Sequence, residues 1–251
     1  MDDGLFSLRM VVASLFPGDH TLFRQAAASS SVPVEIVEAD GADAACRGIA
    51  DGADFVVVDG ALPGGDVSQI VAAARSAKSP PFTITLIDPQ AAAATFETDA
   101  LAVKSAGPVE AKAFVERTLR VRLQSRVLVV DDSATTRSIV RKMLAGTRFP
   151  LDVTEAEEGF AALKLAKENE FDLAFLDYNM PGFSGLETLA EFKRENRRMN
   201  VVLMTAVADE SLAERALAQG AAFLKKPFFP ADIEAALGRF YGFRALNPKR
   251  A

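Results

Sequence analysis

Two stretches of eleven residues, 118 positions apart (172 − 54), carry nearly the same order of residue types. Asp54–Gly64 reads DFVVVDGALPG and Asp172–Gly182 reads DLAFLDYNMPG, so each places an apolar run between two aspartates and then a Pro-Gly pair. A lysine and a proline recur further along at an offset of 122, first as Lys104 and Pro108 and then as Lys226 and Pro230. Repetition at about the length of a domain predicts two copies of one fold.

The second half alternates apolar runs with stretches that carry apolar residues at helical spacing. Strands are expected at 126–131, 151–156, 171–176, 201–206 and 222–226, and helices at 133–144, 159–169, 185–196, 210–219 and 230–241. The first half keeps this rhythm less cleanly, with strands expected at 8–15, 32–37, 55–58, 82–87 and 101–104. Strands that alternate with helices indicate βαβ units. We therefore predict an α/β fold of two doubly wound five-stranded parallel sheets in tandem, with domains at 1–122 and 123–251.

Composition excludes several classes of protein. The single cysteine, Cys46, allows no internal disulfide, and four closely spaced zinc ligands are absent. The net charge of −6 and a pI of about 5.0 argue against a nucleic-acid partner. The chain starts with acidic residues, and its apolar runs are far shorter than the ~20 residues that span a bilayer. These features favour a cytoplasmic protein without membrane insertion.

Polar side chains of the second half follow the expected strands at the points where the strands end. Asp131 and Asp132 follow the first strand, Asp177 follows the third, Thr205 ends the fourth and Lys226 ends the fifth. In an open parallel sheet, functional groups collect at the carboxyl ends of the strands. Three carboxylates, a hydroxyl and an ammonium are therefore expected in one crevice.

Clustered carboxylates repel one another, and a divalent cation removes that conflict. Oxygen ligands suit Mg²⁺, which can also bind a phosphoryl oxygen and neutralise charge during transfer. A lysine and a hydroxyl can contact the remaining phosphoryl oxygens. The crevice therefore suits phosphoryl transfer to a carboxylate, with Mg²⁺ as the cofactor.

At this point the sequence resembles a known family, the receiver domains of bacterial response regulators such as CheY. The motifs that carry the resemblance, in order, are Asp131-Asp132, Asp177 to Gly182, Thr205-Ala206 and Lys226-Pro227-Phe228. The resemblance covers about residues 125–245 and implies a flavodoxin-like, CheY-like fold. It also implies a switch that accepts a phosphoryl group and is not an enzyme beyond its own phosphorylation and dephosphorylation.

The resemblance assigns a role to each matching position. Asp177 is the phosphoacceptor, and Lys226 contacts the phosphoryl group. Asp132 and Asp177 ligate Mg²⁺ together with the backbone carbonyl of Asn179, while Asp131 acts mainly through water. The family's lysine directly precedes a proline, which selects Lys226 over Lys225.

Three further positions follow from the same resemblance. Thr205 is the switch hydroxyl that moves to the phosphoryl oxygen, and Phe223 is the switch aromatic residue whose rotamer follows it. Asn179 and Val207 occupy the positions that tune the rate of dephosphorylation.

The first half keeps only part of this pattern. Asp59 stands at the phosphoacceptor position and Lys104 at the lysine position, but the acidic pair is missing and Ser105 follows the lysine. Without the pair, Mg²⁺ loses most of its charged ligands, so this half is expected to be a degenerate and inactive receiver. An alternative is that Asp19 or Asp88 reaches the crevice.

The implied function is a two-component response regulator phosphorylated on Asp177 by a histidine kinase or a histidine phosphotransfer protein. Its signal would pass to a protein partner through the Glu210–Tyr241 face, or through a homodimer, because few residues follow Tyr241. Two alternatives stay open. One is a scaffold that works without phosphorylation through the degenerate half. The other is a phosphatase of the haloacid-dehalogenase group, which the adjacent placement of Asp131 and Asp132 disfavours.

Overall fold

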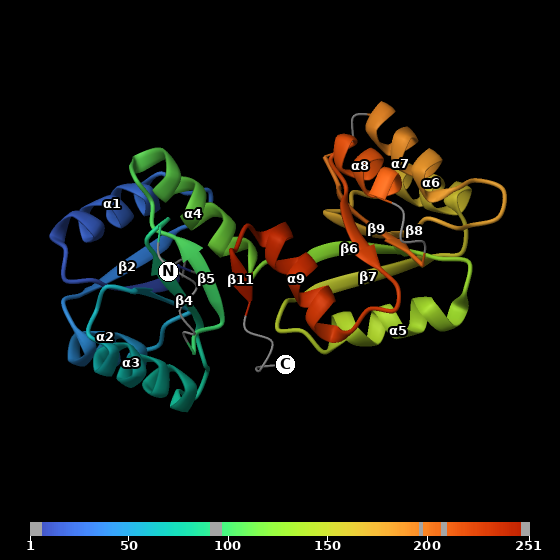
Figure 1. Cartoon of the computed structure of the whole chain (residues 1–251). Coiled ribbons are helices and arrows are strands. Elements are labelled where there is room, and N and C mark those ends of the chain that lie inside the picture. The colour runs from blue at the N-terminus through green and yellow to red at the C-terminus, as the bar shows by residue number, and fades with distance from the viewer. Residues whose placement is uncertain (1–6, 91–96, 196–197, 207–209, 247–251) are drawn as a thin grey trace, which may run out of the picture. The chain divides into compact units, whose positions relative to one another are not determined.

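The computed structural model describes residues 7–90, 97–195, 198–206 and 210–246 (Figure 1). The chain divides into two compact units. The first unit runs to Leu119 and also takes in the segment that begins at Tyr241, and the second unit comprises Arg120–Phe240. Each unit is built around its own sheet.

The first unit alternates strands and helices along the chain. Its elements are β1 (Leu8–Ala13), α1 (Pro17–Ala28), β2 (Val34–Ala39), α2 (Ala42–Ala50), β3 (Phe55–Asp59), α3 (Gly64–Ser76), β4 (Phe82–Ile87), β5 (Ala100–Val103), α4 (Pro108–Arg120) and β11 (Ala245–Leu246). The strand order is β11-β5-β4-β3-β1-β2. All pairings in this sheet are parallel except that of β11 with β5.

The second unit repeats the same order of strands. Its elements are β6 (Ser125–Val130), α5 (Ala134–Ala145), β7 (Leu151–Ala156), α6 (Gly159–Glu168), β8 (Leu173–Asp177), α7 (Gly185–Arg194), β9 (Asn200–Thr205), α8 (Glu210–Ala218), β10 (Ala222–Lys225) and α9 (Pro230–Tyr241). The sheet order is β10-β9-β8-β6-β7, with every pairing parallel. Two five-stranded parallel sheets in tandem are thus confirmed, and β11 is an addition to the first.

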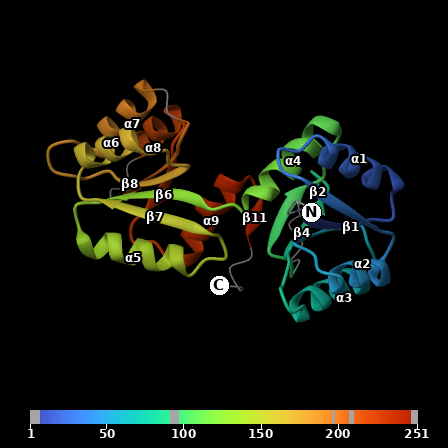
Figure 2. The same ribbon diagram turned by 180° about the vertical axis from the view of Figure 1, so that it is seen from behind.

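Helices cover both faces of each sheet, which is why the central strands are apolar throughout. In the first unit α1 and α4 lie on one face and α2 and α3 on the other; in the second, α5 and α9 lie opposite α6, α7 and α8 (Figures 1 and 2). All five residues of β3 and of β8 are buried, as expected for a parallel strand covered on both sides. The only polar side chains in these two strands are Asp59 and Asp177, at their carboxyl ends.

Each unit has its own apolar core. In the first unit α1 contacts α4 through Phe23 and Phe114, whose rings meet edge to face at 5.6 Å. In the second unit the core between the sheet and α6 and α7 includes Leu176, Leu189 and Phe192. These cores hold the strands rigidly, so the side chains at the strand ends are fixed in position.

Candidate functional site: carboxylates at the strand ends

The second unit brings together acidic side chains from two neighbouring strands. Asp131 follows β6 and Asp177 ends β8; both are buried, with 1% and 4% of their surface exposed, while Asp132 is exposed. One carboxylate oxygen from each of the three lies within 4.8 Å of the others. The structure therefore forms the acidic cluster that the sequence predicts.

Lys226, which directly follows β10, reaches across the same edge of the sheet. Its Nζ lies 2.7 Å from Oδ2 of Asp131 and 2.8 Å from Oδ1 of Asp177. Its backbone amide donates to the carbonyl of Thr205 at 2.7 Å, which continues the β9–β10 pairing and fixes the direction of the side chain. One ammonium is thus shared between the two buried carboxylates.

Local structure holds the acidic loop after β6 in place. The amide of Asp131 donates to the carbonyl of Ala156 at 3.2 Å, and Oδ1 of Asp131 accepts from the amide of Ser133 at 2.9 Å. Ser133 caps α5 by accepting from the amide of Thr136. Arg137 then donates to the backbone carbonyl of Asp131 at 2.7 Å, a contact that the sequence analysis did not identify.

A glycine permits close packing of α7 against the backbone of Asp177. A Cβ atom added to Gly185, the first residue of α7, would overlap the backbone carbonyl oxygen of Asp177. Any side chain there would push α7 away from the end of β8. The close approach keeps the backbone around Asp177 fixed, and Ser184 secures the start of α7 through a capping box with Glu187.

Burial and neighbouring charges act in opposite directions on the pKa values of this cluster. Burial raises the pKa of Asp177, and the charges of Asp131 and Asp132 raise it as well, whereas the hydrogen bond and charge of Lys226 act in the other direction. At Lys226, burial favours the neutral amine, but its hydrogen bonds to Asp131 and Asp177 outweigh burial, so its pKa is raised. The cluster holds more negative charge than one ammonium neutralises.

Three of the other predicted residues lie in the described part of the chain, in strands of the same sheet or just after one. Thr205 is the last residue of β9 and is fully buried. Phe223 lies in β10, partly buried, and packs against the core of the second unit. Asn179 is exposed, two residues beyond Asp177. Val207 lies outside the described residues.

The first unit has a corresponding but different arrangement. Nζ of Lys104 lies 2.9 Å from Oδ2 of Asp59 and 2.8 Å from Oδ2 of Asp19. The hydroxyl of Ser14 donates to Asp19 at 2.6 Å and lies 3.3 Å from Oδ2 of Asp59. Of the two alternatives raised from the sequence, Asp19 reaches the site, whereas Asp88 is exposed and accepts from the amide of Gln90.

Backbone hydrogen bonds identify the equivalent positions in the two units. The amide of Ser14 donates to the carbonyl of Ala39, as that of Asp131 does to Ala156. Ser14 and Leu15 therefore replace Asp131 and Asp132. The amide of Lys104 likewise donates to the carbonyl of Ile87, as that of Lys226 does to the carbonyl of Thr205, so Ile87 stands where the second unit has Thr205.

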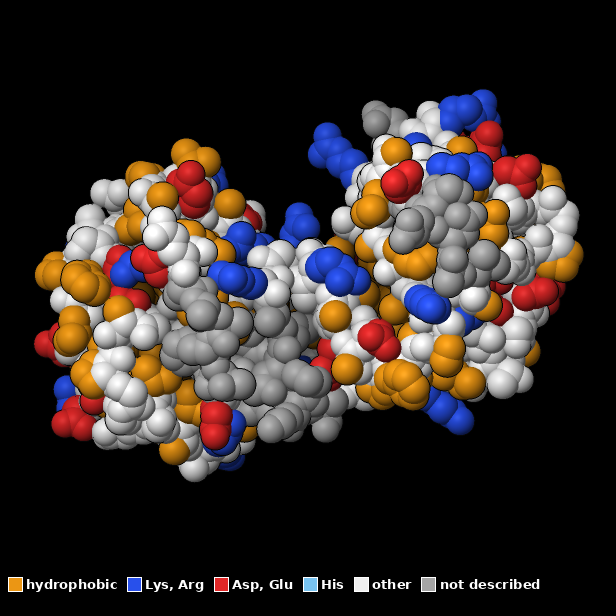
Figure 3. All heavy atoms as spheres, in the orientation of Figure 1, with side chains coloured by type: hydrophobic (Ala, Val, Ile, Leu, Met, Phe, Trp, Pro, Cys, Tyr) orange, Lys and Arg blue, Asp and Glu red, His pale blue; other side chains and the backbone are white. Residues whose placement is uncertain are grey.

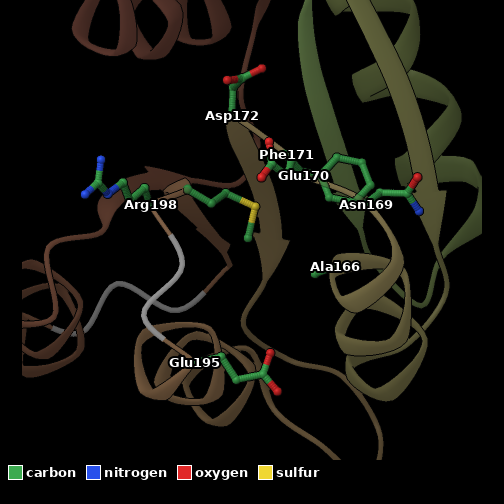
Figure 4. A pocket seen from close by; sticks show the side chains of 8 residues that line it. Ala166, Asn169, Glu170, Phe171, Asp172, Glu195 and Arg198 are labelled. Carbon is green, nitrogen blue, oxygen red and sulfur yellow. The ribbon is translucent and has the colours of Figure 1, made fainter.

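A separate hollow of about 430 Å³ lies at the opposite end of β8. Phe171 and Met199 are among the residues that line it. Figure 4 shows that the charged groups of Asp172, Glu195 and Arg198 point in different directions around it. Because these groups do not converge on one point, the hollow is not a second candidate for the chemistry at Asp177.

The comparisons with known proteins assign the second unit to a family. A family model described as the response regulator receiver domain matches residues 127–238. Chemotaxis protein CheY-3 of Vibrio cholerae is 33% identical over 119 residues, which cover 46% of this chain and 91% of that protein. The chain belongs to the response regulator receiver family. Chemotaxis protein CheY of Bacillus subtilis is 34% identical over 104 residues, covering 41% of this chain and 86% of that protein.

The similarity to solved receiver structures extends over both units. A solved structure titled a probable two-component system response regulator/GGDEF domain protein aligns with a TM-score of 0.53, covering 93% of this chain and 98% of that chain. Its identity of 20% supports the fold alone. The fold of the chain therefore comprises two receiver-like halves.

Two further observations concern the charges on the surface and the length of the helices. On the face shown in Figure 3, basic and acidic side chains are interspersed over each unit, without a continuous basic stripe among the described residues. Within the described ranges, no helix combines the length and the apolar character needed to cross a bilayer.

Proposed function

We propose that the second unit is a phosphorylation switch in which Asp177 accepts a phosphoryl group from a histidine kinase or a histidine phosphotransfer protein. The observation that carries the proposal is the placement of Asp177 at the end of β8, within reach of Asp131, Asp132 and Lys226. An oxygen of the Asp177 carboxylate attacks phosphorus, a P–O bond forms, the P–N bond of phosphohistidine breaks, and the imidazole leaves with a proton.

The acidic cluster fits Mg²⁺, because all its donors are carboxylate oxygens and its charge exceeds that of Lys226. Asp132 and Asp177 would hold the ion with the backbone carbonyl of Asn179, and Asp131 would act through water. The bound ion neutralises charge on the phosphoryl oxygens. Lys226 is already directed at Asp177 and contacts a further phosphoryl oxygen after transfer.

The signal leaves the site through the fourth and fifth strands of the second unit. Thr205 moves its hydroxyl to the phosphoryl group, and the ring of Phe223 follows. The face at Glu210–Tyr241 then binds or releases a protein partner, or a second copy of the chain, while Asn179 and Val207 tune the lifetime of the phosphoryl group. The protein acts in the cytoplasm as a switch and is not an enzyme with a separate substrate.

The first unit does not accept phosphate in this proposal. Asp59 lacks an acidic pair, because Ser14 and Leu15 stand in its place, and Lys104 already pairs with both Asp59 and Asp19. We propose domains at 1–122 and 123–251, with β11 of the second segment added to the sheet of the first. Only the second domain accepts a phosphoryl group.

Intact mass after incubation with acetyl phosphate and Mg²⁺ tests the proposal. The wild-type chain should gain one phosphoryl group, Asp177→Asn should gain none, and Asp59→Asn should behave as wild type. An equal gain in Asp177→Asn contradicts the assignment. No gain in the wild-type chain favours the second candidate, a scaffold that works without phosphorylation. The observation behind this candidate is the first unit's site, where Lys104 pairs with both Asp19 and Asp59.

A further inference from the structure

The last described strand of the chain belongs to the sheet of the first unit, although it follows the last helix of the second. In β11, Ala245 and Leu246 pair antiparallel with Leu101 and Ala100 of β5. This segment covers the β5 edge of the first sheet, so an element that follows the phosphoaccepting unit completes the other one.

The segment is held by contacts on both sides of its backbone. The amide of Arg244 donates to the carbonyl of Leu101 at 2.8 Å. Phe243 is buried, with its ring centroid 5.7 Å from that of Phe82 in β4. Beyond Tyr241, which is buried and groups with the first unit, two paired residues and one aromatic ring make up the attachment. Burial of a Phe side chain contributes only ~1.5–3 kcal/mol, so this last part of the attachment is small. Such an attachment can open without unfolding the unit.

The connection between α9 and this attachment is only two residues long. The helix ends at Tyr241, which is 1% exposed, and only Gly242 and Phe243 precede the hydrogen bond of Arg244. Gly242 turns the chain with a φ of 75°, and a Cβ there would lie 3.0 Å from Cδ of Arg117. Each residue spans at most ~3.3–3.6 Å, so two residues cannot absorb a large displacement of the helix end.

The other end of the same helix begins close to the site. Lys226, bound to Asp131 and Asp177, is followed by three residues and then by Pro230, where α9 starts. The amide of Phe229 donates to Asp232 at 2.8 Å and fixes this connection. One short path of chain therefore runs from the site lysine through α9 to β11.

We propose that β11 couples the state of Asp177 to the β5 edge of the first unit. The coupling rests on the proposed phosphorylation of Asp177. A phosphoryl group changes the partners of Lys226, α9 shifts with β10, and the taut connection strains the pairing of β11 with β5. The partner that reads the switch is then the first unit itself. By linkage, release of β11 favours the phosphorylated state by the same factor.

Hydrogen exchange of the full chain tests the coupling, with beryllofluoride and Mg²⁺ as the probe. Peptides that cover 98–104 and 242–246 should exchange several-fold faster with the probe than without it, and Asp177→Asn should not respond. A short Gly-Ser segment inserted after Gly242 should abolish the response. The same insertion after Lys78, in an exposed loop of the first unit, is the matched control and should preserve it.

The outcomes separate the two proposals. If the chain binds beryllofluoride and exchange of both peptides stays unchanged or slows, the coupling is wrong and the phosphorylation proposal stands. If the insertion after Gly242 leaves the faster exchange intact, the connection is not the route. If the wild-type chain binds no beryllofluoride, both proposals fail. As a reciprocal measurement, Phe243→Ala should bind beryllofluoride several-fold more tightly, and unchanged affinity overturns the coupling.

Discussion

The second unit gathers three carboxylates around one ammonium, whereas the first gathers two carboxylates around one ammonium and adds the hydroxyl of Ser14. With all groups ionised, the second site carries −3 + 1 = −2 and the first −2 + 1 = −1. The backbone hydrogen bonds around the two sites are equivalent, so charge rather than fold separates them. The difference indicates that the same fold persists whether its strand ends carry three clustered carboxylates or two.

The surroundings of the two lysines sharpen the same contrast. Lys104 lies 4.7 Å from the ring centroid of Phe16, which occupies the position of the helix-capping Ser133. Burial favours the neutral amine of Lys104, but its hydrogen bonds to Asp19 and Asp59 outweigh burial and raise its pKa. The first site is satisfied by its own side chains, whereas the second is short of positive charge.

The largest difference between the units should appear in Mg²⁺ binding. Residues that merely support a metal ligand cost roughly 10- to 100-fold in affinity when removed, so Asp132→Ala should lose at least that much. Leu15→Ala, at the equivalent position of the first unit, should leave the affinity unchanged. Isothermal titration calorimetry of the full chain measures both. Equal losses in the two variants contradict the assignment of the metal site to the second unit.

Removal of either lysine should destabilise its own unit. Lys104→Met leaves Asp59 and Asp19 without a counter-ion, and we expect a loss on the order of 2–3 kcal/mol, below that of a fully buried pair because Lys104 keeps part of its surface in water. Lys226→Met should lose a similar amount, which Mg²⁺ restores only in the second unit. Hydrogen exchange of peptides from β3 and β8 reads the units separately. If Mg²⁺ also restored the stability of Lys104→Met, the proposed difference between the two sites would be wrong.

The pH dependence should follow the raised pKa values. The stabilisation from Lys104 and Lys226 is fully present below the unfolded lysine pKa of about 10.4 and is lost as pH rises through the higher folded values. Asp177 acts oppositely: the cost of its charge is present above its raised pKa and is relieved as pH falls through that value. Denaturant titrations at several pH values, without Mg²⁺, should show the acidic gain in wild type and not in Asp177→Asn.

The smallest effects should come from the helix starts beside the two sites. Ser133→Ala removes the cap of α5 and should cost ~1 kcal/mol. Phe16→Ser offers α1 a cap but removes the ring near Lys104, a contact of ~0.5–1 kcal/mol, so its net effect should be near zero. Urea unfolding measures both changes. A loss in Phe16→Ser equal to that in Ser133→Ala would show that the ring matters more than we infer.

The site of the second unit was predictable because its residues lie at the carboxyl ends of strands. Apolar runs locate the strands, and the carboxyl ends of parallel strands meet at one edge, so Asp131, Asp177 and Lys226 converge without any knowledge of the coordinates. The five-stranded sheets were predictable for the same reason.

Two features do not follow a strand or a period: Asp19, which the sequence raised only as an alternative, and β11, which it did not predict. Asp19 lies in the first turn of α1, and only the three-dimensional path of that turn brings it to Lys104. The strand β11 has two residues, too few for alternation to be recognised, and its pairing with β5 joins residues 144 positions apart (245 − 101). Pairings of such high sequence separation leave no local signal.

Mapping the phosphoryl group is the most direct test of the account. Acyl phosphates formed with acetyl phosphate and Mg²⁺ can be reduced with borohydride, which converts the modified aspartate to homoserine, and located by peptide mass spectrometry. The account predicts homoserine at position 177 and unmodified aspartate at positions 19 and 59. Homoserine at position 59, alone or at a level comparable to position 177, would contradict the claim that the internal ion pair of the first unit replaces a phosphoacceptor site.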